Sequence, residues 1–365
     1  FGASTVDVTL DGSLSADSDG TIAAFAWTGT PDPADVAGPT VTLGVGAHTF
    51  GLVVTDDKGA ASAQDTVTIT VNAPPVANAG PDQHVNLPFP VASGKAVSNT
   101  VDVTLDGSLS ANSDGTIAGY AWSGTPDPAD TVSPVVTLGM GAHTFSLTVT
   151  DNDGSASAAA TVTVFVNSPP VANAGPDQQV NLPIGATSMD VTLDAGLSFD
   201  PDGSVAGYVW SGTPDPADTV NPTVSLTAGS HMFTLVVTDN DGAASAAATV
   251  NVSVNIPPVA EAGPDQFVNT APAYVKGAFS PAASVTLDGS ASGDVDGSIV
   301  SYTWTGPVDP DDVAKPTVSL NSGVYTFSLT VTDDHGAVSA ADTVTITVNV
   351  PPTANAGPAQ HVNLP

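Results

Sequence analysis

The chain repeats itself four times, and this internal repetition constrains its fold more than any other feature. Each copy contains one tryptophan: Trp27, Trp122, Trp210 and Trp304. The spacings are 95, 88 and 94 residues (122 − 27, 210 − 122 and 304 − 210). The Pro-Pro pairs have the same spacing, since they begin at Pro74, Pro169, Pro257 and Pro351. A unit of this length holds its own core, so we expect similar domains in tandem.

The repeated phrases also predict where the domains divide. We expect a first domain that lacks its first strand, then three domains and the first strand of a following one: residues 1–72, 73–167, 168–255, 256–349 and 350–365. The second and fourth domains carry inserts, at residues 89–99 and 271–283. One interpretation of these inserts is a tolerated loop insertion; the other is a lateral contact between copies of the chain.

The two ends of the sequence resemble two parts of one domain. Joining Pro365 to Phe1 gives "HVNLPFGASTVDVTLDGS", which is close to the internal text "VNLPIGATSMDVTLDAG". In one interpretation the sequence is a single period of a longer chain. In the other, "QHVNLP" of one subunit completes the first domain of the next by strand addition. Both interpretations predict copies that continue head to tail as a filament.

Each repeat has the alternating pattern of strands. "DTVTITVN" predicts that Val67, Ile69 and Val71 point inward while the threonines point outward. Alternation of this kind favours half-buried antiparallel strands, and turn signals such as "DSDG" and "DNDG" separate them. About seven strands in roughly 90 residues predict an all-β fold of tandem immunoglobulin-like β-sandwiches in a linear array. The tryptophans lie in mid-strand, where packing in the core is favoured over ligand binding.

The charge of the chain restricts its partners. There are 37 acidic residues and 4 basic ones, a net charge of −33. This charge excludes nucleic acid and anionic membranes as partners and favours cations. The chain has no cysteine, which excludes thiolate metal sites. No apolar run reaches the roughly 18 residues that a membrane span needs, so we expect no span in this segment.

Several phrases, taken in order, resemble the polycystic kidney disease (PKD) domain family. They are "PPVANAGPDQ", "LDGSLS", the "YAW" strand, "FSLTVTDNDG" and a closing "TVTVFVN". The strand of the tryptophan continues as "WTGTPDPAD" where many members have "WDFGDG", which is similar to a bacterial or archaeal surface-protein variety. The resemblance covers the whole chain. It implies extracellular or cell-surface modules that space, display or adhere, and it does not imply catalysis.

Two acidic turns recur in every copy, together with an asparagine before each Pro-Pro linker. We expect these turns to meet the linker at one end of each sandwich. The candidate ligands are Asp17, Asp19, Asp56, Asn72, Asn112, Asp114, Asp151, Asn167, Asp200, Asp202, Asp239, Asn255, Asp294, Asp296, Asp333 and Asn349. Carboxylate, amide and carbonyl oxygens suit Ca²⁺, which accepts six to eight oxygens in irregular geometry, better than Mg²⁺.

A second interpretation of these turns remains open. Asp-Gly turns use Asp to accept backbone hydrogen bonds and Gly for positive φ, without any metal. The family resemblance implies calcium, because some PKD domains bind it through a linker asparagine and this pair of turns. Asn112 replaces the Asp of the other copies and should weaken its site. The acids of "PDPAD", such as Asp32 and Asp35, are either turn caps or a further metal site.

These features together predict a structural, non-enzymatic role. We expect an extracellular tandem-repeat protein that forms a calcium-rigidified filament, sheath or stalk. A cell-surface adhesin is one alternative, for which an aromatic-rich loop would be the evidence. Spacer modules of a secreted polysaccharide-degrading enzyme are the other, for which an attached catalytic domain would be the evidence.

Overall fold

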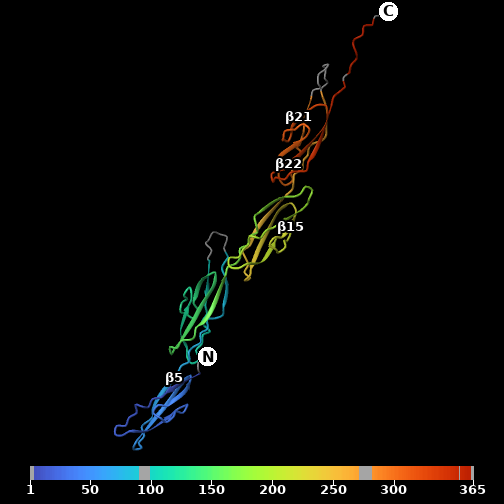
Figure 1. The fold of residues 1–365 in the computed structure, drawn as a ribbon. Coiled ribbons are helices and arrows are strands. Elements are labelled where there is room, and N and C mark those ends of the chain that lie inside the picture. Colours follow the sequence, from blue (N-terminus) through green and yellow to red (C-terminus); the bar gives the residue numbers. More distant parts are fainter. Residues whose placement is uncertain (1–3, 90–98, 271–281, 353, 363–365) are drawn as a thin grey trace. The chain divides into compact units, whose positions relative to one another are not determined.

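The computed structural model describes residues 4–89, 99–270, 282–352 and 354–362. Within these ranges the chain forms twenty-three strands and no helix. The predicted all-β fold is therefore confirmed. Because the described part has no helix, it also has none long and apolar enough to cross a membrane. Figure 1 shows the strands of each repeat gathered in their own stack, from blue in the first repeat to red in the fourth.

The strands recur in the same order in each repeat. The first repeat contains β1 (Thr5–Thr9), β2 (Ile22–Thr28), β3 (Thr40–Gly44), β4 (Gly46–Asp56) and β5 (Asp65–Val71). The second contains β6 (Gln83–Asn86), β7 (Thr100–Thr104), β8 (Ile117–Ser123), β9 (Val135–Gly139), β10 (Gly141–Asp151) and β11 (Ala160–Asn167). The third contains β12 (Gln178–Asn181), β13 (Met189–Thr192), β14 (Val205–Ser211), β15 (Thr223–Leu226), β16 (Gly229–Asp239) and β17 (Ala248–Asn255). The fourth contains β18 (Gln266–Asn269), β19 (Ala283–Thr286), β20 (Ile299–Thr305), β21 (Thr317–Leu320), β22 (Gly323–Asp333) and β23 (Asp342–Asn349).

Each repeat pairs these strands into a large and a small sheet. In the second repeat the large sheet has the order β6-β11-β10-β8 and the small one pairs β7 with β9. The third and fourth repeats have the same order. One part of the prediction is wrong: β6, β12 and β18 pair parallel, not antiparallel, with the last strand of their repeat. A strand that enters from the linker lies beside the outgoing strand in the same direction.

The first repeat differs at the edge of its large sheet. This sheet has the order β2-β4-β5, and no described strand lies beyond β5. Val67 is consequently 39% exposed, while its counterparts Val162 and Val344 are 1% and 0% exposed. Val67 lines a hollow beside Leu10, Trp27 and Leu52, so it faces inward as predicted, although it is only partly covered. The equivalent strands β11, β17 and β23 of the other repeats carry a further parallel strand at this edge.

The tryptophans fill the cores, as predicted. All four are buried, and each backbone N–H donates to the last Asp of its own "PDPAD" or "VDPDD" phrase, as from Trp122 to Asp130 Oδ1 at 2.8 Å. The indole Nε1 of Trp122 donates to the Thr131 carbonyl at 2.9 Å. These carboxylates therefore act as caps that hold the tryptophan strand. The Gly of the following "WSG" phrase is required by packing, because a Cβ at Gly212 would overlap the Phe233 ring.

The chain divides into two compact units, Phe1–Pro169 and Pro170–Pro365. The first unit contains the first two repeats and the junction at Asn72. The second contains the last two repeats and the junction at Asn255. Most residues of the two predicted inserts lie outside the described residues, so the lateral contact expected there stays a prediction.

Candidate metal site at the repeat junctions

The candidate site of the second unit begins where β17 ends. Asn255 is the last residue of this strand and is 3% exposed. Its Nδ2 donates to Asp333 Oδ2 at 2.8 Å and to Asn181 Oδ1 at 3.1 Å. The next backbone N–H, of Ile256, donates to Asp296 Oδ2 at 3.1 Å. The linker is thus fastened to both acidic turns of the fourth repeat, as the sequence predicts.

The junction of the first unit has the same construction. Asn72 follows β5, and its Nδ2 donates to Asp151 Oδ2 at 2.8 Å and to Ser155 Oγ at 2.9 Å. The Ala73 N–H donates to Asp114 Oδ2 at 2.8 Å. Ser155 was not among the predicted site residues. The signal for its role was the position itself, four residues after the Asp that closes the "TVTD" strand.

The Asp that closes each of these strands is held by its own turn. Asp333 Oδ1 accepts the N–H groups of His335 at 3.0 Å and Ala337 at 2.7 Å. Asp56, Asp151 and Asp239 accept the corresponding pairs of N–H groups. The turn interpretation therefore accounts for one oxygen of each carboxylate. At Asp151 and Asp333 the second oxygen accepts a hydrogen bond from the amide of the junction asparagine.

Other side-chain atoms of the acidic turns and junctions are buried without a hydrogen-bond partner among the described residues. At the junction of the second unit these are Asn255 Oδ1 and Asp294 Oδ2, and at that of the first unit they are Asn72 Oδ1 and the side-chain oxygen and nitrogen of Asn112. Away from these two junctions they are Asp17 Oδ2 and both carboxylate oxygens of Asp200. Leaving a buried polar atom unsatisfied costs about 1–3 kcal/mol. Turn chemistry does not explain oxygens that accept nothing.

The electrostatics of these turns differ from one acid to the next. Burial raises the pKa of Asp294, and the charges of Asp296 and Asp333 raise it further. Burial likewise raises the pKa of Asp200. In contrast, the hydrogen bond from the Asn72 side chain lowers the pKa of Asp151. The first turn of the third and fourth repeats is therefore the place where uncompensated negative charge accumulates.

The first repeat compensates part of this charge with a lysine. Lys58 Nζ lies 2.8 Å from Asp19 Oδ2 in an exposed ion pair, and this pair lowers the pKa of Asp19. The positive charge next to the Asp19 carboxylate therefore comes from a side chain of the same repeat. Asp17 lies in the same turn, near Asp57 across Gly20.

The remaining predicted residues lie outside the two junctions at Asn72 and Asn255. Asn167 Nδ2 donates to Asn86 Oδ1 at 3.1 Å at the end of the first unit. Asn349 Nδ2 donates to Asn269 Oδ1 at 2.8 Å. Asp200, Asp202 and Asp239 lie in the two acidic turns of the third repeat. The sequence prediction missed Asn86, Asn181 and Asn269, although the recurrence of their phrases "QHVN", "QQVN" and "QFVN" was a signal.

The arrangement is a mixed oxygen site and not a cluster of carboxylates alone. No group of three or more His, Cys, Asp or Glu side chains in the described ranges is arranged to hold a metal. At each junction the available oxygens come from an asparagine amide, from carboxylates and from the turn. Oxygen ligands without nitrogen or sulfur suit a hard cation.

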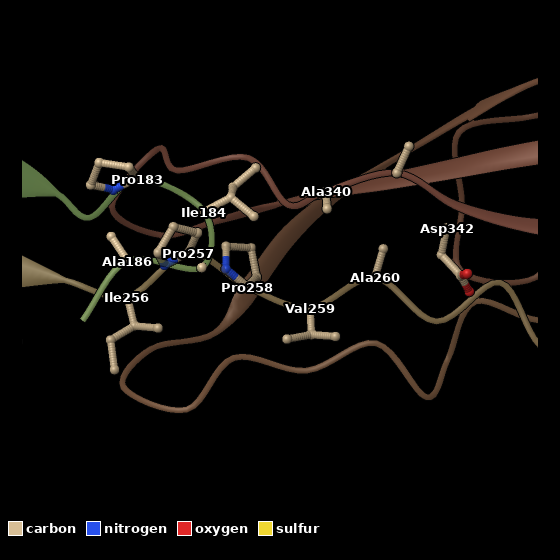
Figure 2. Close-up of a pocket in the computed structure, with 12 residues that line it drawn as sticks. Pro183, Ile184, Ala186, Ile256, Pro257, Pro258, Val259, Ala260, Ala340 and Asp342 are labelled. Atoms are coloured by element: carbon tan, nitrogen blue, oxygen red, sulfur yellow. The ribbon is translucent and has the colours of Figure 1, made fainter.

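An apolar groove adjoins the second of these junctions. It encloses about 430 Å³ and is lined by residues 183–186 after β12, 256–260 of the linker and 340–342. Figure 2 shows Ile184 and Ala186 beside Pro257, with Val259 and Ala260 further along the linker. Proline fixes φ, so a linker that also lies against this loop has little freedom to bend.

Comparison with known proteins identifies the family. The model of the PKD domain of KIAA0319-like proteins matches residues 79–166, 174–254 and 277–348. The chain belongs to this PKD-domain family. The resemblance to PKD domains is thereby confirmed, whereas the comparisons do not support the bacterial or archaeal variety.

The relatives are mammalian proteins. The mouse dyslexia-associated protein KIAA0319-like protein is 34% identical over 396 residues, covering 95% of this chain and 34% of that protein. Human dyslexia-associated protein KIAA0319 is 34% identical over 392 residues, covering 94% and 33%. The chain thus spans about a third of the length of these relatives. It is an extracellular or cell-surface segment, as predicted. Neither the family description nor these names denotes an enzyme.

Among solved structures, the I-band fragment I67–I69 of titin is similar in outline. Its TM-score is 0.37 at 11% identity, covering 77% of this chain and all of that fragment. A similarity of this size adds nothing to the fold that the strands themselves define.

Proposed function

We propose that this chain is a stiff extracellular stalk or spacer of PKD repeats, in which Ca²⁺ locks the joints between neighbouring repeats. The observation that supports it best is the junction at Asn255. There a buried amide oxygen and a buried carboxylate oxygen of Asp294 accept no hydrogen bond. Head-to-tail continuation of such repeats produces a filament, sheath or stalk.

The linker geometry supports a mechanical role. Asn255 and Ile256 already donate to Asp333 and Asp296 of the next repeat. A cation held by oxygens from both sides would add bonds between the same elements and remove hinge freedom. Asn255 Oδ1 and Asp294 Oδ2 are the oxygens that would hold it, with the charges of Asp296 and Asp333 beside them. The metal contributes charge compensation and multiple oxygen contacts when bound.

The negative charge of the chain also supports the binding of a cation at the junction. With a net charge of −33, the surface concentrates cations near every acidic turn. Burial raises the pKa of Asp294, so its ionised form is less favoured than that of a free carboxyl and gains from a nearby positive charge. A bound divalent cation supplies that charge, and Ca²⁺ tolerates the irregular geometry of loops better than Mg²⁺ does.

The two junctions should differ in affinity. Asn112 occupies the position that Asp294 occupies at the junction of the second unit, so the first site has one negative charge less. We expect tighter calcium binding at Asn255 than at Asn72. The substitution Asn112→Asp should strengthen the weaker site.

The proposal is tested by calorimetric titration of the intact chain with Ca²⁺ and with Mg²⁺, followed by thermal unfolding. Calcium at 100 times its Kd stabilises the bound state by about 2.7 kcal/mol. For a domain of roughly 90 residues this raises Tm by about 10–20 °C. Asp294→Asn should weaken the tighter site toward the affinity of the site at Asn72. The matched control Asp309→Asn removes the same charge from an exposed turn and should leave binding unchanged.

Small-angle scattering measures the mechanical part of the proposal. Calcium should narrow the distribution of lengths, and a chelator should broaden it. Absence of binding heat, or an unchanged distribution with calcium bound, contradicts the proposal.

A further inference from the structure

The third repeat differs from the others at one exposed position in the middle of β17. Asn251 lies there on the open face of the large sheet, between Val250 and Val252, which are both fully buried. With Ser253 it forms the phrase "NVS". The register of the sheets places a threonine at the equivalent position of the other three repeats: Thr68, Thr163 and Thr345.

The strand itself does not require an asparagine at this position. The backbone N–H of Asn251 donates to Asp177 Oδ1 at 2.8 Å. In the second repeat the backbone N–H of Thr163 donates to Asp82 Oδ1 at 2.7 Å, and the fourth repeat has the same bond. Asn251 Nδ2 adds only contacts of 3.4 Å to the two oxygens of Asp177, longer than the usual range of about 2.7–3.2 Å. The side chain therefore contributes little to the fold.

The strand beside Asn251 also departs from the pattern of the repeats. Met232 of β16 lies directly opposite Asn251 and is 62% exposed. The other repeats place a threonine opposite a threonine here, as Thr144 lies opposite Thr163. The Asn251 N–H points to Asp177 and away from β16, so Asn251 and Met232 form the kind of antiparallel pair in which side chains approach most closely. An exposed apolar side chain thus lies beside the amide.

We propose that Asn251 carries an N-linked oligosaccharide and that the first sugar of this oligosaccharide covers Met232. Asn-X-Ser is an acceptor sequence for N-glycosylation where X is not proline. The chain is an extracellular or cell-surface segment, the class of protein in which such glycans occur. The phrase "NPT" at Asn221 is excluded by its proline, so "NVS" is the one acceptor in the sequence. This inference does not rest on calcium binding.

The transfer uses an isoprenoid-diphosphate-linked oligosaccharide as the sugar donor. Asn251 Nδ2 forms a bond to the anomeric carbon of the first sugar. The bond from that carbon to the diphosphate oxygen breaks, and its electron pair stays on the diphosphate. One amide proton passes to a base of the transferring enzyme. The second N–H remains and can still donate to Asp177, so the folded strand accepts the modified side chain.

Met232 explains why the third repeat gains from this modification. A sugar ring has a face of C–H groups, and placing that face on the thioether side chain removes apolar surface of both from water, which is favourable. In the first repeat the equivalent threonines, Thr49 and Thr68, lie with their hydroxyl oxygens 3.1 Å apart. Such a pair satisfies itself and presents no comparable apolar surface.

Peptide mapping of the native chain, as secreted by its own cells, tests the modification. An endoproteinase that cleaves before aspartate releases residues 241–264, which contain the acceptor. We expect this peptide to carry the mass of an oligosaccharide, located at Asn251 by fragmentation. Two variants made in the same cells form a matched pair. Ser253→Ala destroys the acceptor without touching Asn251 and should lose the sugar, whereas Ser253→Thr preserves the acceptor and should keep it.

Oxidation by peroxide tests the contact with Met232. Exposed methionines are converted to the sulfoxide, and Met140, which is 49% exposed in the second repeat, serves as the internal reference. The rate for Met232 relative to Met140 should rise severalfold in Ser253→Ala, because its cover is lost. The same ratio should stay at the native value in Ser253→Thr.

Each contrary result overturns a stated part of the inference. An unmodified peptide 241–264 from the native chain overturns the glycan. A sugar that persists on this peptide in Ser253→Ala also overturns it, because the attachment then does not use the acceptor. A glycan at Asn251 with equal oxidation ratios in the two variants overturns the contact with Met232. None of these results depends on whether the chain binds calcium.

Discussion

The side chain of Asn255 is predicted to hold the third and fourth repeats together even without a metal. Asn255→Ala removes a hydrogen bond to the buried carboxylate of Asp333 and a neutral one to Asn181. A bond to a charged group contributes about 1.5–3 kcal/mol and a neutral one about 0.5–1.5 kcal/mol. The expected loss is therefore about 3 kcal/mol, or roughly 100-fold in the local opening equilibrium.

Hydrogen-exchange mass spectrometry in a chelator measures this loss. Peptides that cover the end of β22 and the turn after Asp333 should exchange roughly 100-fold faster in Asn255→Ala. The control is Asn349→Ala, at the same position of the fourth repeat. Asn349 is exposed and makes one side-chain bond, to Asn269 Oδ1 at 2.8 Å, so exchange should change less than about tenfold. Equal acceleration in the two variants, or none in Asn255→Ala, would refute the reasoning.

Three further predictions follow from the cores and the surface. Asp130→Ala removes the acceptor of the Trp122 N–H and should lower the free energy of unfolding by about 1 kcal/mol in urea titrations, whereas Asp130→Asn keeps an acceptor and should cost less. Gly212→Ala forces a methyl group into a core phenylalanine ring and should destabilise its domain by about 2 kcal/mol or more, seen as a lower Tm. Lys315 lowers the pKa of Asp288 to about 2, below the ordinary value of 3.8, so this ion pair favours the folded state above pH 3.8 and the benefit is lost as the pH falls toward 2. The urea midpoint of Lys315→Met should therefore lie below that of the natural chain at pH 5, and the difference should shrink as the pH falls through 3.8 toward 2; a difference that does not shrink over this range contradicts the assignment.

Much of the candidate site was predictable because its residues recur with the repeat. The sequence placed Asn255, Asp294, Asp296 and Asp333 at one end of a sandwich, and the hydrogen bonds and charges of the structure bring them together. The role of the "PDPAD" acids remained open between a cap and a metal site. The bond from Trp122 to Asp130 favours the cap, since it uses an oxygen that a metal would need.

The amino-acid sequence by itself determined the number of repeats, the all-β fold and the cores around the tryptophans. These follow from local rules, because alternation of side chains and turn residues act over a few neighbouring positions. Only the tertiary structure decided which oxygens of the acidic turns have no partner among the described residues, and that the strand from each linker pairs parallel. Asn72 and Asp151 meet across 79 residues of chain. A bond of that range depends on how two whole sandwiches are connected, and no local pattern encodes its geometry.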